Sequence, residues 1–274
     1  MFIIPAKDLE WQISTPHVMG ILNLTPDSFY KASRHSNIDS ALAQADIFIQ
    51  EGACIIDIGA QSSRPGAYME GSEIEIQRLI PFIEAIHQAY PKQLISVDTF
   101  NASVAEAALK AGAHIINDIS CGGFDENILK VVSKNNAGYI GMHLTGDMHS
   151  MHKVEPREDI IATLISYFEA KKKLLSKYGI EHWVIDPGFG FGKTVEENFT
   201  IVKKINKLKI VGLPILLGAS RKSSLYKTLS IESKDALNAT TIVNTVALLN
   251  GANILRVHDV KEASEIVQLL KKIS

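Results

Sequence analysis

The sequence lacks the features that would tie it to a membrane, a nucleic acid or a disulfide-stabilised scaffold. Two cysteines in 274 residues are too few for a disulfide framework and favour a reducing compartment. Twenty-eight basic and thirty acidic side chains give a net charge of −2, so we expect no long-range attraction to nucleic acid or anionic membranes. No run reaches the roughly 18 apolar residues of a transmembrane helix, and the first residues lack the basic region of a signal peptide. The sequence therefore predicts a soluble, cytoplasmic protein with neither a nucleic acid nor a membrane partner.

The composition is that of an ordinary globular protein, with 46% hydrophobic and 21% charged residues. At about 150 residues per domain the length suggests nearly two domains, but α/β barrels of roughly 200–250 residues fold as one. No linker or low-complexity segment interrupts the chain. We therefore expect a single domain over residues 1–274.

Short apolar runs alternate along the chain with longer helical segments. The runs are rich in Ile, Val and Leu and show little strict alternation, which is typical of strands buried on both faces of a parallel sheet. We expect strands at His17–Asn23, Cys54–Gly59, Leu94–Thr99, His114–Ser120, Gly138–His143, His182–Gly188, Pro214–Ser220 and Ile254–His258. We expect helices at Ile38–Glu51, Ser72–Tyr90, Asn101–Ala111, Glu126–Asn135, Pro156–Tyr178, Val195–Leu208, Asp235–Asn250 and Val260–Ile273.

This alternation predicts a (β/α)8 TIM barrel of the α/β class, because it contains eight strands that are each followed by a helix. A doubly wound open sheet is the alternative. The segment FIIPAKDLEWQI, residues 2–13, predicts a short N-terminal hairpin that closes the bottom of the barrel. In the second helix, Ser72 and Glu75 have the spacing of a capping box, and Pro81 predicts a kink or a break.

Polar side chains stand at the end of each predicted strand. Because the carboxyl ends of barrel strands share one face, we expect these side chains to surround a ligand site. Arginine, lysine and histidine there suit an anion, carboxylates and an amide suit a flat heterocycle with several N–H groups, and Asn23 offers an oxygen ligand for Mg²⁺. Together these groups favour a polyphosphate ester of a heterocycle as the ligand. The strand-end residues are Asn23, Asp57, Asp98, Asn117, His143, Asp186, Ser220, Arg221, Lys222, Arg256 and His258, with Arg64 as a further cation.

Two other patterns have less specific meanings. The run GFGFGKT at Gly188–Thr194 resembles a phosphate loop, but Pro187 stands where the Walker A pattern requires glycine. We interpret it as a barrel loop whose glycines let the backbone approach a ligand. His143, His149 and His152 could form a transition-metal site, although their spacing and the scarcity of nearby carboxylates favour a plain loop.

Seven segments resemble the dihydropteroate synthase family. DPGFGFGK, SRKS and a terminal RVHDV are specific in combination, and the resemblance runs from about residue 17 to residue 260. It implies a pterin-binding TIM barrel, in agreement with the strand count. The segments are MGILNLTPDSF (Met19–Phe29), DIGAQSSRPGA (Asp57–Ala67), ISVDT (Ile95–Thr99), IIND (Ile115–Asp118), DPGFGFGK (Asp186–Lys193), GASRKS (Gly218–Ser223) and RVHDV (Arg256–Val260).

The resemblance implies a transferase of folate biosynthesis. This enzyme condenses 6-hydroxymethyl-7,8-dihydropterin pyrophosphate with 4-aminobenzoate, giving 7,8-dihydropteroate and pyrophosphate. It further implies Mg²⁺ as the cofactor with Asn23 as its ligand, inhibition by sulfonamides that mimic 4-aminobenzoate, and a homodimer whose contacts involve the last helices.

The resemblance also assigns roles to residues of this sequence. The residues expected to bind the pterin are Asp98, Asn117, Asp186 and Lys222, with Asp57 at the floor of the pterin pocket or at the pyrophosphate rim. Those expected to bind pyrophosphate are Asn23, Arg64, Arg256 and His258, and those for 4-aminobenzoate are Ser63, Arg64, Pro65, Phe191, Ser220 and Lys222. The expected catalytic residues are Lys222, Asp186, Arg256 and His258.

The sequence departs from the family pattern at two places. Serine stands at position 63 where the family usually has threonine, and Lys31 stands where the family has an acidic residue. Two alternatives remain. One is a folate methyltransferase-type pterin barrel, which would not need SRKS and RVHDV around a pyrophosphate. The other, motivated by Lys31, is a non-catalytic pterin-binding paralogue.

Overall fold

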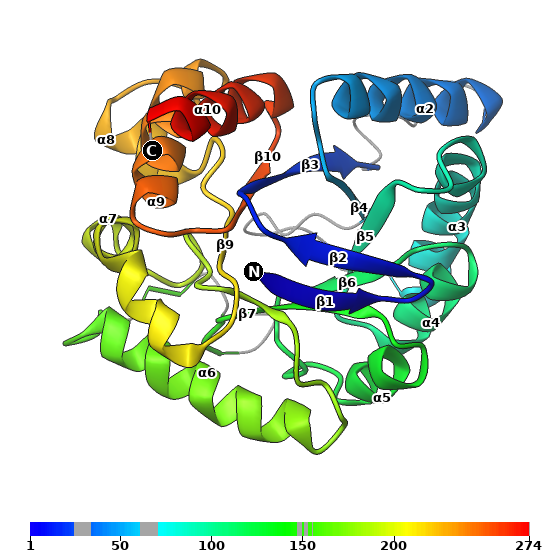
Figure 1. The fold of residues 1–274 in the computed structure, drawn as a ribbon, viewed down its shortest axis with the longest axis horizontal. Helices are drawn as coiled ribbons and strands as arrows, with labels where there is room; N and C mark the ends of the chain where they lie inside the picture. Colours follow the sequence, from blue (N-terminus) through cyan, green and yellow to red (C-terminus); the bar gives the residue numbers. More distant parts are fainter. Residues whose placement is uncertain (25–33, 61–70, 147–149, 151–152, 155, 274) are drawn as a thin grey trace.

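A computed structural model describes residues 1–24, 34–60, 71–146, 150, 153–154 and 156–273, with the side chains of residues 34–37 excepted. Eight parallel strands form one sheet in the order β8-β7-β6-β5-β4-β3-β10-β9, and helices surround it (Figure 1). The edge strands also meet, because Ile185 donates a backbone hydrogen bond to Pro214 (3.0 Å) and bridges to Ile215. The sheet is therefore nearly closed, and the predicted barrel is confirmed.

The strands lie where the apolar runs predict them. Most residues of these eight strands are buried, as expected for parallel strands that are covered by side chains on both faces of the sheet. Their bounds are β3 His17–Asn23, β4 Ile55–Gly59, β5 Leu94–Asp98, β6 Ile115–Asp118, β7 Gly138–Met142, β8 Val184–Asp186, β9 Leu216–Leu217 and β10 Ile254–Val257.

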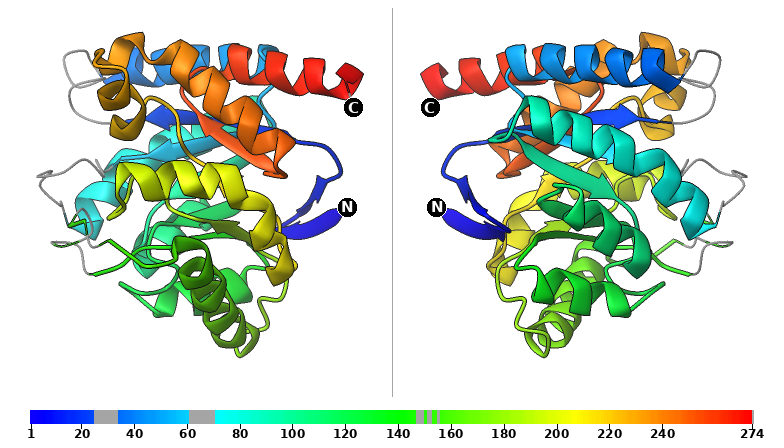
Figure 2. Two further views of the ribbon diagram at one scale, coloured as in Figure 1. Left: turned by 90° about the vertical axis from the view of Figure 1, so that its left-hand side faces the viewer. Right: turned by 90° about the vertical axis from the view of Figure 1, so that its right-hand side faces the viewer.

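The N-terminal hairpin closes one end of the barrel, as predicted (Figures 1 and 2). It consists of the antiparallel strands β1 Phe2–Ala6 and β2 Leu9–Ile13. Trp11 is fully buried in the hairpin and donates its indole N–H to His17 Nδ1 at 2.9 Å. The hairpin packs on one apolar side chain from each of seven barrel strands, namely Met19, Ile55, Ile115, Ile140, Val184, Leu216 and Ile254. The opposite end of the barrel, at the carboxyl ends of the strands, is the end where the sequence predicts the ligand site.

The helices form the outer layer and bury their apolar faces on the sheet. Their bounds are α2 Arg34–Gln50, α3 Ser72–Ala89, α4 Ala102–Lys110, α5 Asn127–Lys134, α6 Ile160–Ser176, α7 Val195–Lys204, α8 Ser223–Thr228, α9 Leu237–Leu249 and α10 Val260–Ile273, with 3-10 turns η1 Ile205–Val211 and η2 Ser233–Asp235. No helix within the described part of the chain is long and apolar enough to cross a membrane.

Several local predictions about these helices were wrong. Helix α3 begins after Gly71 without a side-chain cap, and Glu75 instead accepts a hydrogen bond from Asn101 Nδ2 at 3.1 Å, so Ser72 and Glu75 form no capping box. The predicted break at Pro81 is also wrong, because α3 continues through this residue to Ala89. A capping box does occur in α7, where Thr194 and Glu197 bond each other's backbone N–H groups. The sequence did not predict the short helix α8.

Candidate active site

Six of the predicted residues lie on strands of the barrel, and one of them, Asn23, is the last residue of β3. Asp57 lies on β4, Asp98 on β5, Asn117 on β6, Asp186 on β8 and Arg256 on β10. Asp57, Asn117 and Asp186 are buried, which is costly for polar groups unless partners satisfy them. The contacts among these residues show how that cost is met.

Arg256 links two carboxylates across the barrel mouth. Its Nε donates to Asp57 Oδ2 at 2.6 Å, and its Nη2 donates to Asp98 Oδ2 at 2.6 Å. Asn117 Nδ2 donates to the same Asp57 oxygen at 3.2 Å. The other Asp57 oxygen, Oδ1, is buried and finds no partner within the described residues. These contacts leave a buried acceptor beside a delocalised cation.

The electrostatics of this cluster hold Asp98 close to a protonation equilibrium. Burial raises the pKa of Asp98 to about 6, and the Arg256 charge acts against that rise. Burial alone would lower the pKa of Arg256, but the Asp57 and Asp98 carboxylates raise it instead. Arg256 therefore stays charged, while Asp98 can change its protonation state near neutral pH.

Lys222 faces this cluster from the loop after β9. Its Nζ donates to the Phe189 carbonyl oxygen at 2.6 Å and lies 4.5 Å from the centre of the Phe191 ring. Burial lowers the pKa of Lys222 to about 8, although the Asp186 carboxylate opposes this shift. Asp186 is itself fixed by Gly188 N, which donates to its Oδ1 at 2.7 Å. Lys222 and Asp186 thus belong to one electrostatic unit.

The glycine-rich loop between β8 and α7 directs its carbonyl oxygens at cations. Besides the Lys222 contact, Lys193 Nζ donates to the carbonyls of Gly188 (2.8 Å) and Phe191 (3.1 Å). Arg157 Nη1 donates to the Gly192 carbonyl at 3.0 Å. Gly188, Gly190 and Gly192 have positive φ, a conformation that favours glycine. In the described structure these glycines bring the backbone close to the protein's own cations.

Ser220 and His258 join the two loops that follow β9 and β10. Ser220 Oγ lies 3.0 Å from His258 Nδ1 and accepts a hydrogen bond from His258 N at 3.2 Å. The His258 side chain is exposed, whereas Ser220 is buried. Ser220 therefore orients an imidazole ring whose other nitrogen remains available at the rim of the site.

One cation that the sequence placed in the site belongs elsewhere. Arg221 was expected to offer a cation to an anionic ligand, but its guanidinium forms a two-point ion pair with Asp259. The same guanidinium donates to backbone carbonyls of Ser233 and Lys234. Because Asp259 already neutralises its charge, Arg221 does not serve as a cation for an anionic ligand.

His143 is buried in the position that directly follows β7. Burial lowers its pKa to about 2, and its ring packs edge-on against Tyr167 with centroids 4.7 Å apart. The other two histidines of the possible metal triad, at positions 149 and 152, lie outside the described residues. In the part of the chain that is described, no cluster of three or more metal-ligating His, Cys, Asp or Glu residues occurs.

For the remaining predicted site residues the structure gives either no position or no side-chain partner. Ser63, Arg64, Pro65 and Lys31 lie outside the described residues. Asn23 is half-buried at the end of β3, and no side-chain hydrogen bond engages it within the described structure. The residues that sequence reasoning missed are Lys193, Arg157 and Glu197. Their one signal was the position of Lys193 within the glycine-rich run GFGFGKT, with Glu197 four residues further along.

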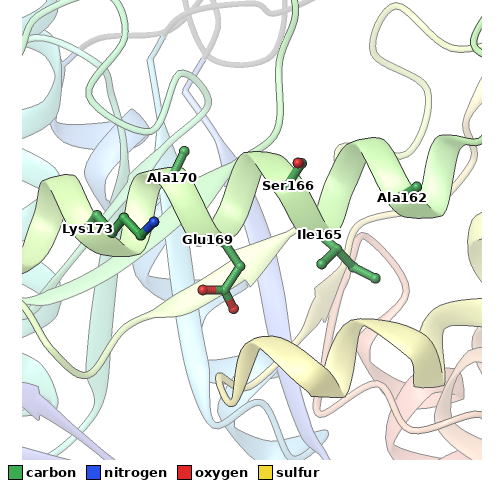
Figure 3. Close-up of a pocket in the computed structure, with 6 residues that line it drawn as sticks. All are labelled: Ala162, Ile165, Ser166, Glu169, Ala170 and Lys173. Atoms are coloured by element: carbon green, nitrogen blue, oxygen red, sulfur yellow. The ribbon is translucent and has the colours of Figure 1, made fainter.

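A depression on the outer surface lies away from this cluster (Figure 3). A single helix, α6, lines it with Ala162, Ile165, Ser166, Glu169, Ala170 and Lys173. None of the strand-end residues contributes to it. The barrel mouth therefore remains the candidate active site.

The family model described as "Pterin binding enzyme" matches residues 19–258. The chain belongs to the pterin binding enzyme family. A dihydropteroate synthase from Synechocystis is 40% identical over 256 residues, covering 92% of this chain and 88% of that protein. Structures of dihydropteroate synthase from the same family superpose closely: one from Yersinia pestis with a sulfonamide drug complex has a TM-score of 0.91 and 34% identity, and covers 99% of both chains. A structure from Xanthomonas albilineans with 4-aminobenzoic acid has a TM-score of 0.90 and 32% identity, and covers 98% of both chains.

Proposed function

We propose that this protein is a dihydropteroate synthase, a transferase of folate biosynthesis. It joins 4-aminobenzoate to the methylene carbon of 6-hydroxymethyl-7,8-dihydropterin pyrophosphate, releasing pyrophosphate. The observation that carries the proposal is the Arg256 bridge between Asp57 and Asp98, with Lys222 and Asp186 opposite, in a barrel of the pterin binding enzyme family. Buried acceptors and two cations at one barrel mouth suit a pterin ring that bears an anionic leaving group.

The acceptors of the cluster bind and polarise the pterin. Asp98, Asn117 and Asp186 face the ring N–H groups, and the free Oδ1 of Asp57 offers one more buried acceptor. A ligand N–H donor at Asp57 Oδ1 would remove the cost of leaving that oxygen unpaired. Their negative charge also stabilises positive charge that develops on the pterin and its methylene carbon as the leaving group departs.

The cations of the site act on the leaving group. The amine of 4-aminobenzoate is a weak nucleophile, so stabilising pyrophosphate matters more than activating the amine. As the new C–N bond forms, the C–O bond breaks and its electron pair leaves with pyrophosphate, while the amine loses a proton to solvent. We assign Arg256 to pyrophosphate as a cation, with Arg64 from outside the described residues. Burial and then the Arg256 charge lower the pKa of His258 to about 4, so we assign its neutral imidazole to pyrophosphate as a hydrogen-bond donor. Lys222, held by Phe189 O and the Phe191 ring, borders the 4-aminobenzoate side with Ser220, Ser63 and Pro65.

Mg²⁺ belongs to this proposal, with Asn23 as its protein ligand. The half-buried Asn23 amide at the end of β3 has no competing side-chain hydrogen bond within the described residues, which fits an ion that keeps waters and substrate phosphates as its other ligands. When bound, Mg²⁺ neutralises charge on the leaving pyrophosphate.

A pyrophosphate-release assay with both substrates tests the proposal. We expect release that requires 4-aminobenzoate, falls when Mg²⁺ is chelated, and is inhibited by a sulfonamide in competition with 4-aminobenzoate. Absence of release at high protein concentration, with the pterin still bound, would identify a non-catalytic paralogue. Methyl transfer from a folate to a corrinoid protein would favour the methyltransferase alternative.

We also propose that the protein is a homodimer that associates through its last helices and resides in the cytoplasm. Helix α9 exposes Ile242, Val246 and Leu249, with 55%, 39% and 62% of each side chain accessible. These positions share one helix face, and apolar patches of this kind mark interaction sites. Sedimentation equilibrium is expected to give the mass of a dimer for the wild-type protein and of a monomer for Val246→Glu. A monomeric wild-type protein would refute the proposed homodimer.

The cytoplasmic location is supported by the cysteines, because the free thiols Cys54 and Cys121 suit a reducing compartment.

A further inference from the structure

The loop that carries Ser220 and Lys222 has little sheet structure to hold it. Strand β9, which precedes the loop, contains two residues, Leu216 and Leu217, and pairs with β10 through Ile254 and Leu255 alone. Side-chain contacts must therefore set how this loop lies against the loop after β10. Arg221, between the two site residues, makes two of these contacts with Asp259, and Ser220 makes two with His258.

Arg221 is fixed through both its backbone and its side chain. Its φ of 54° lies in the left-handed region, and its backbone N donates to Thr240 Oγ1 at 3.0 Å. The backbone oxygen of Arg221 accepts a hydrogen bond from Ser233 Oγ at 3.2 Å. A non-glycine residue in this conformation carries backbone strain, which the surrounding contacts have to offset.

The guanidinium of Arg221 makes a fork-shaped contact with Asp259. Nε donates to Oδ2 at 2.9 Å, and Nη2 donates to Oδ1 at 2.7 Å. Side-chain exposures of 24% for Arg221 and 18% for Asp259 show that water has limited access to the pair. Two parallel charge-assisted bonds fix both distance and orientation, which a single contact would not do.

The two loops are thus held together on both sides. On the substrate side Ser220 contacts His258, and on the outer side Arg221 contacts Asp259. Each outer residue is a direct chain neighbour of a residue that faces the substrate. Loss of the outer pair would therefore leave the Ser220–His258 contact alone to set the spacing between the loops.

We propose that Arg221 and Asp259 are positioning residues for catalysis: their ion pair holds the loop after β9 against the loop after β10, and so fixes Ser220 and Lys222 opposite Arg256 and His258. We assign neither residue a contact with the substrate, because the Arg221 guanidinium is occupied by Asp259 and by the backbone carbonyls of Ser233 and Lys234. This inference rests on the proposed function, because its consequence is a change in how the pterin pyrophosphate is bound.

A double-mutant cycle tests the pair with Arg221→Met, Asp259→Asn and the double variant. Asparagine keeps the capping capacity of position 259 at the start of α10. Each single variant is expected to raise KM for the pterin pyrophosphate and to lower kcat/KM about tenfold, the effect of losing one charge-assisted pair. The decrease in kcat/KM of the double variant is expected to be no larger than that of either single variant. A merely structural role would reduce the amount of active enzyme and leave KM unchanged.

The matched control is the neighbouring pair Glu232–Lys234, which is 73% and 75% exposed and 2.8 Å apart. Glu232→Gln and Lys234→Met should leave KM unchanged. The proposal would be overturned if KM were unchanged in Asp259→Asn, or if the decrease in kcat/KM of the double variant equalled the product of the two single decreases. If Arg221→Met does not fold, Arg221→Lys replaces it, since lysine keeps the charge without the fork and is expected to raise KM. An inactive wild-type protein would instead refute the proposed function.

Discussion

Replacing Lys222 with methionine should make the protein more stable while abolishing its activity. Methionine has nearly the same length as the lysine stem but carries no charge. Burial lowers the pKa of Lys222 from 10.5 to about 8. Since one pKa unit corresponds to about 1.4 kcal/mol, keeping the ammonium charged at this place costs about 3 kcal/mol of unfolding free energy at neutral pH. Loss of the hydrogen bond to Phe189 O offsets about 1 kcal/mol of the gain, so we expect a net stabilisation of about 2 kcal/mol.

The gain should depend on pH in a direction that the lowered pKa fixes. Below pH 8 the wild-type Lys222 is charged in both the folded and the unfolded state, and the full cost is present. Between about pH 8 and 10.5 the unfolded chain holds a proton that the folded chain has released, so wild-type stability rises with pH. Methionine has no proton to release. The advantage of the variant therefore shrinks over this interval and is lost near pH 10.5.

Urea unfolding followed by circular dichroism, at pH 7 and at pH 10, measures this difference. The matched control is Lys234→Met, because Lys234 is 75% exposed and its ammonium is already hydrated. The same preparations are assayed for pyrophosphate release, which only Lys222→Met should lose. A destabilised Lys222→Met at pH 7, or a stability gain that is equal at both pH values, would refute the electrostatic reasoning.

Three further predictions concern the loop and the arginine cluster. Gly188→Ala should lower the unfolding free energy by at least about 3 kcal/mol, because Gly188 has a φ of 71° and an added Cβ would meet a backbone carbonyl oxygen; an unchanged melting temperature would contradict it. Glu197→Gln should cost about 3 kcal/mol in urea unfolding, since Arg157 would keep a buried charge without its carboxylate partner, and a loss below 1 kcal/mol would show that water solvates this site. Arg256→Gln should raise the pKa of Asp98 above about 6, because the Arg256 charge lowers it; a carboxyl titration by NMR that shows a lower value would contradict the cluster.

The fold was predictable because hydrophobic burial dominates the positions that define it. Strands buried on both faces are predominantly apolar, so the single polar residue in a run such as CIIDIG stands out as a candidate site residue. The same pattern located Asp57, Asp98, Asn117 and Asp186 on one face. Helix ends were less predictable, because a cap depends on competing partners. Glu75 had the correct spacing from Ser72, yet Asn101 takes its carboxylate.

The partners of the charged residues could not be predicted, because a sequence gives positions and not directions. Arg221 and Lys222 are adjacent and equally basic, but consecutive side chains of this loop point apart. Lys222 reaches Phe189 O, while Arg221 reaches Asp259, 38 positions later in the chain. The same limit hid Lys193, which is 5% exposed, because its place in the glycine-rich run does not show which way its side chain points.

The glycine-rich loop shows how the site's charge is arranged. In a phosphate-binding loop, backbone N–H groups converge on the anion. Here Gly188 N is occupied by Asp186, Gly190 N by Asn198 Oδ1, and the loop carbonyls bind Lys193, Lys222 and Arg157. The loop carbonyls are therefore ligands for cations, and we assign the negative charge of the substrate to side chains. Lys222 belongs to both parts of the site, because its ammonium donates to one loop carbonyl and interacts with the Asp186 carboxylate, whereas Lys193 and Arg157 bind other carbonyls of the loop.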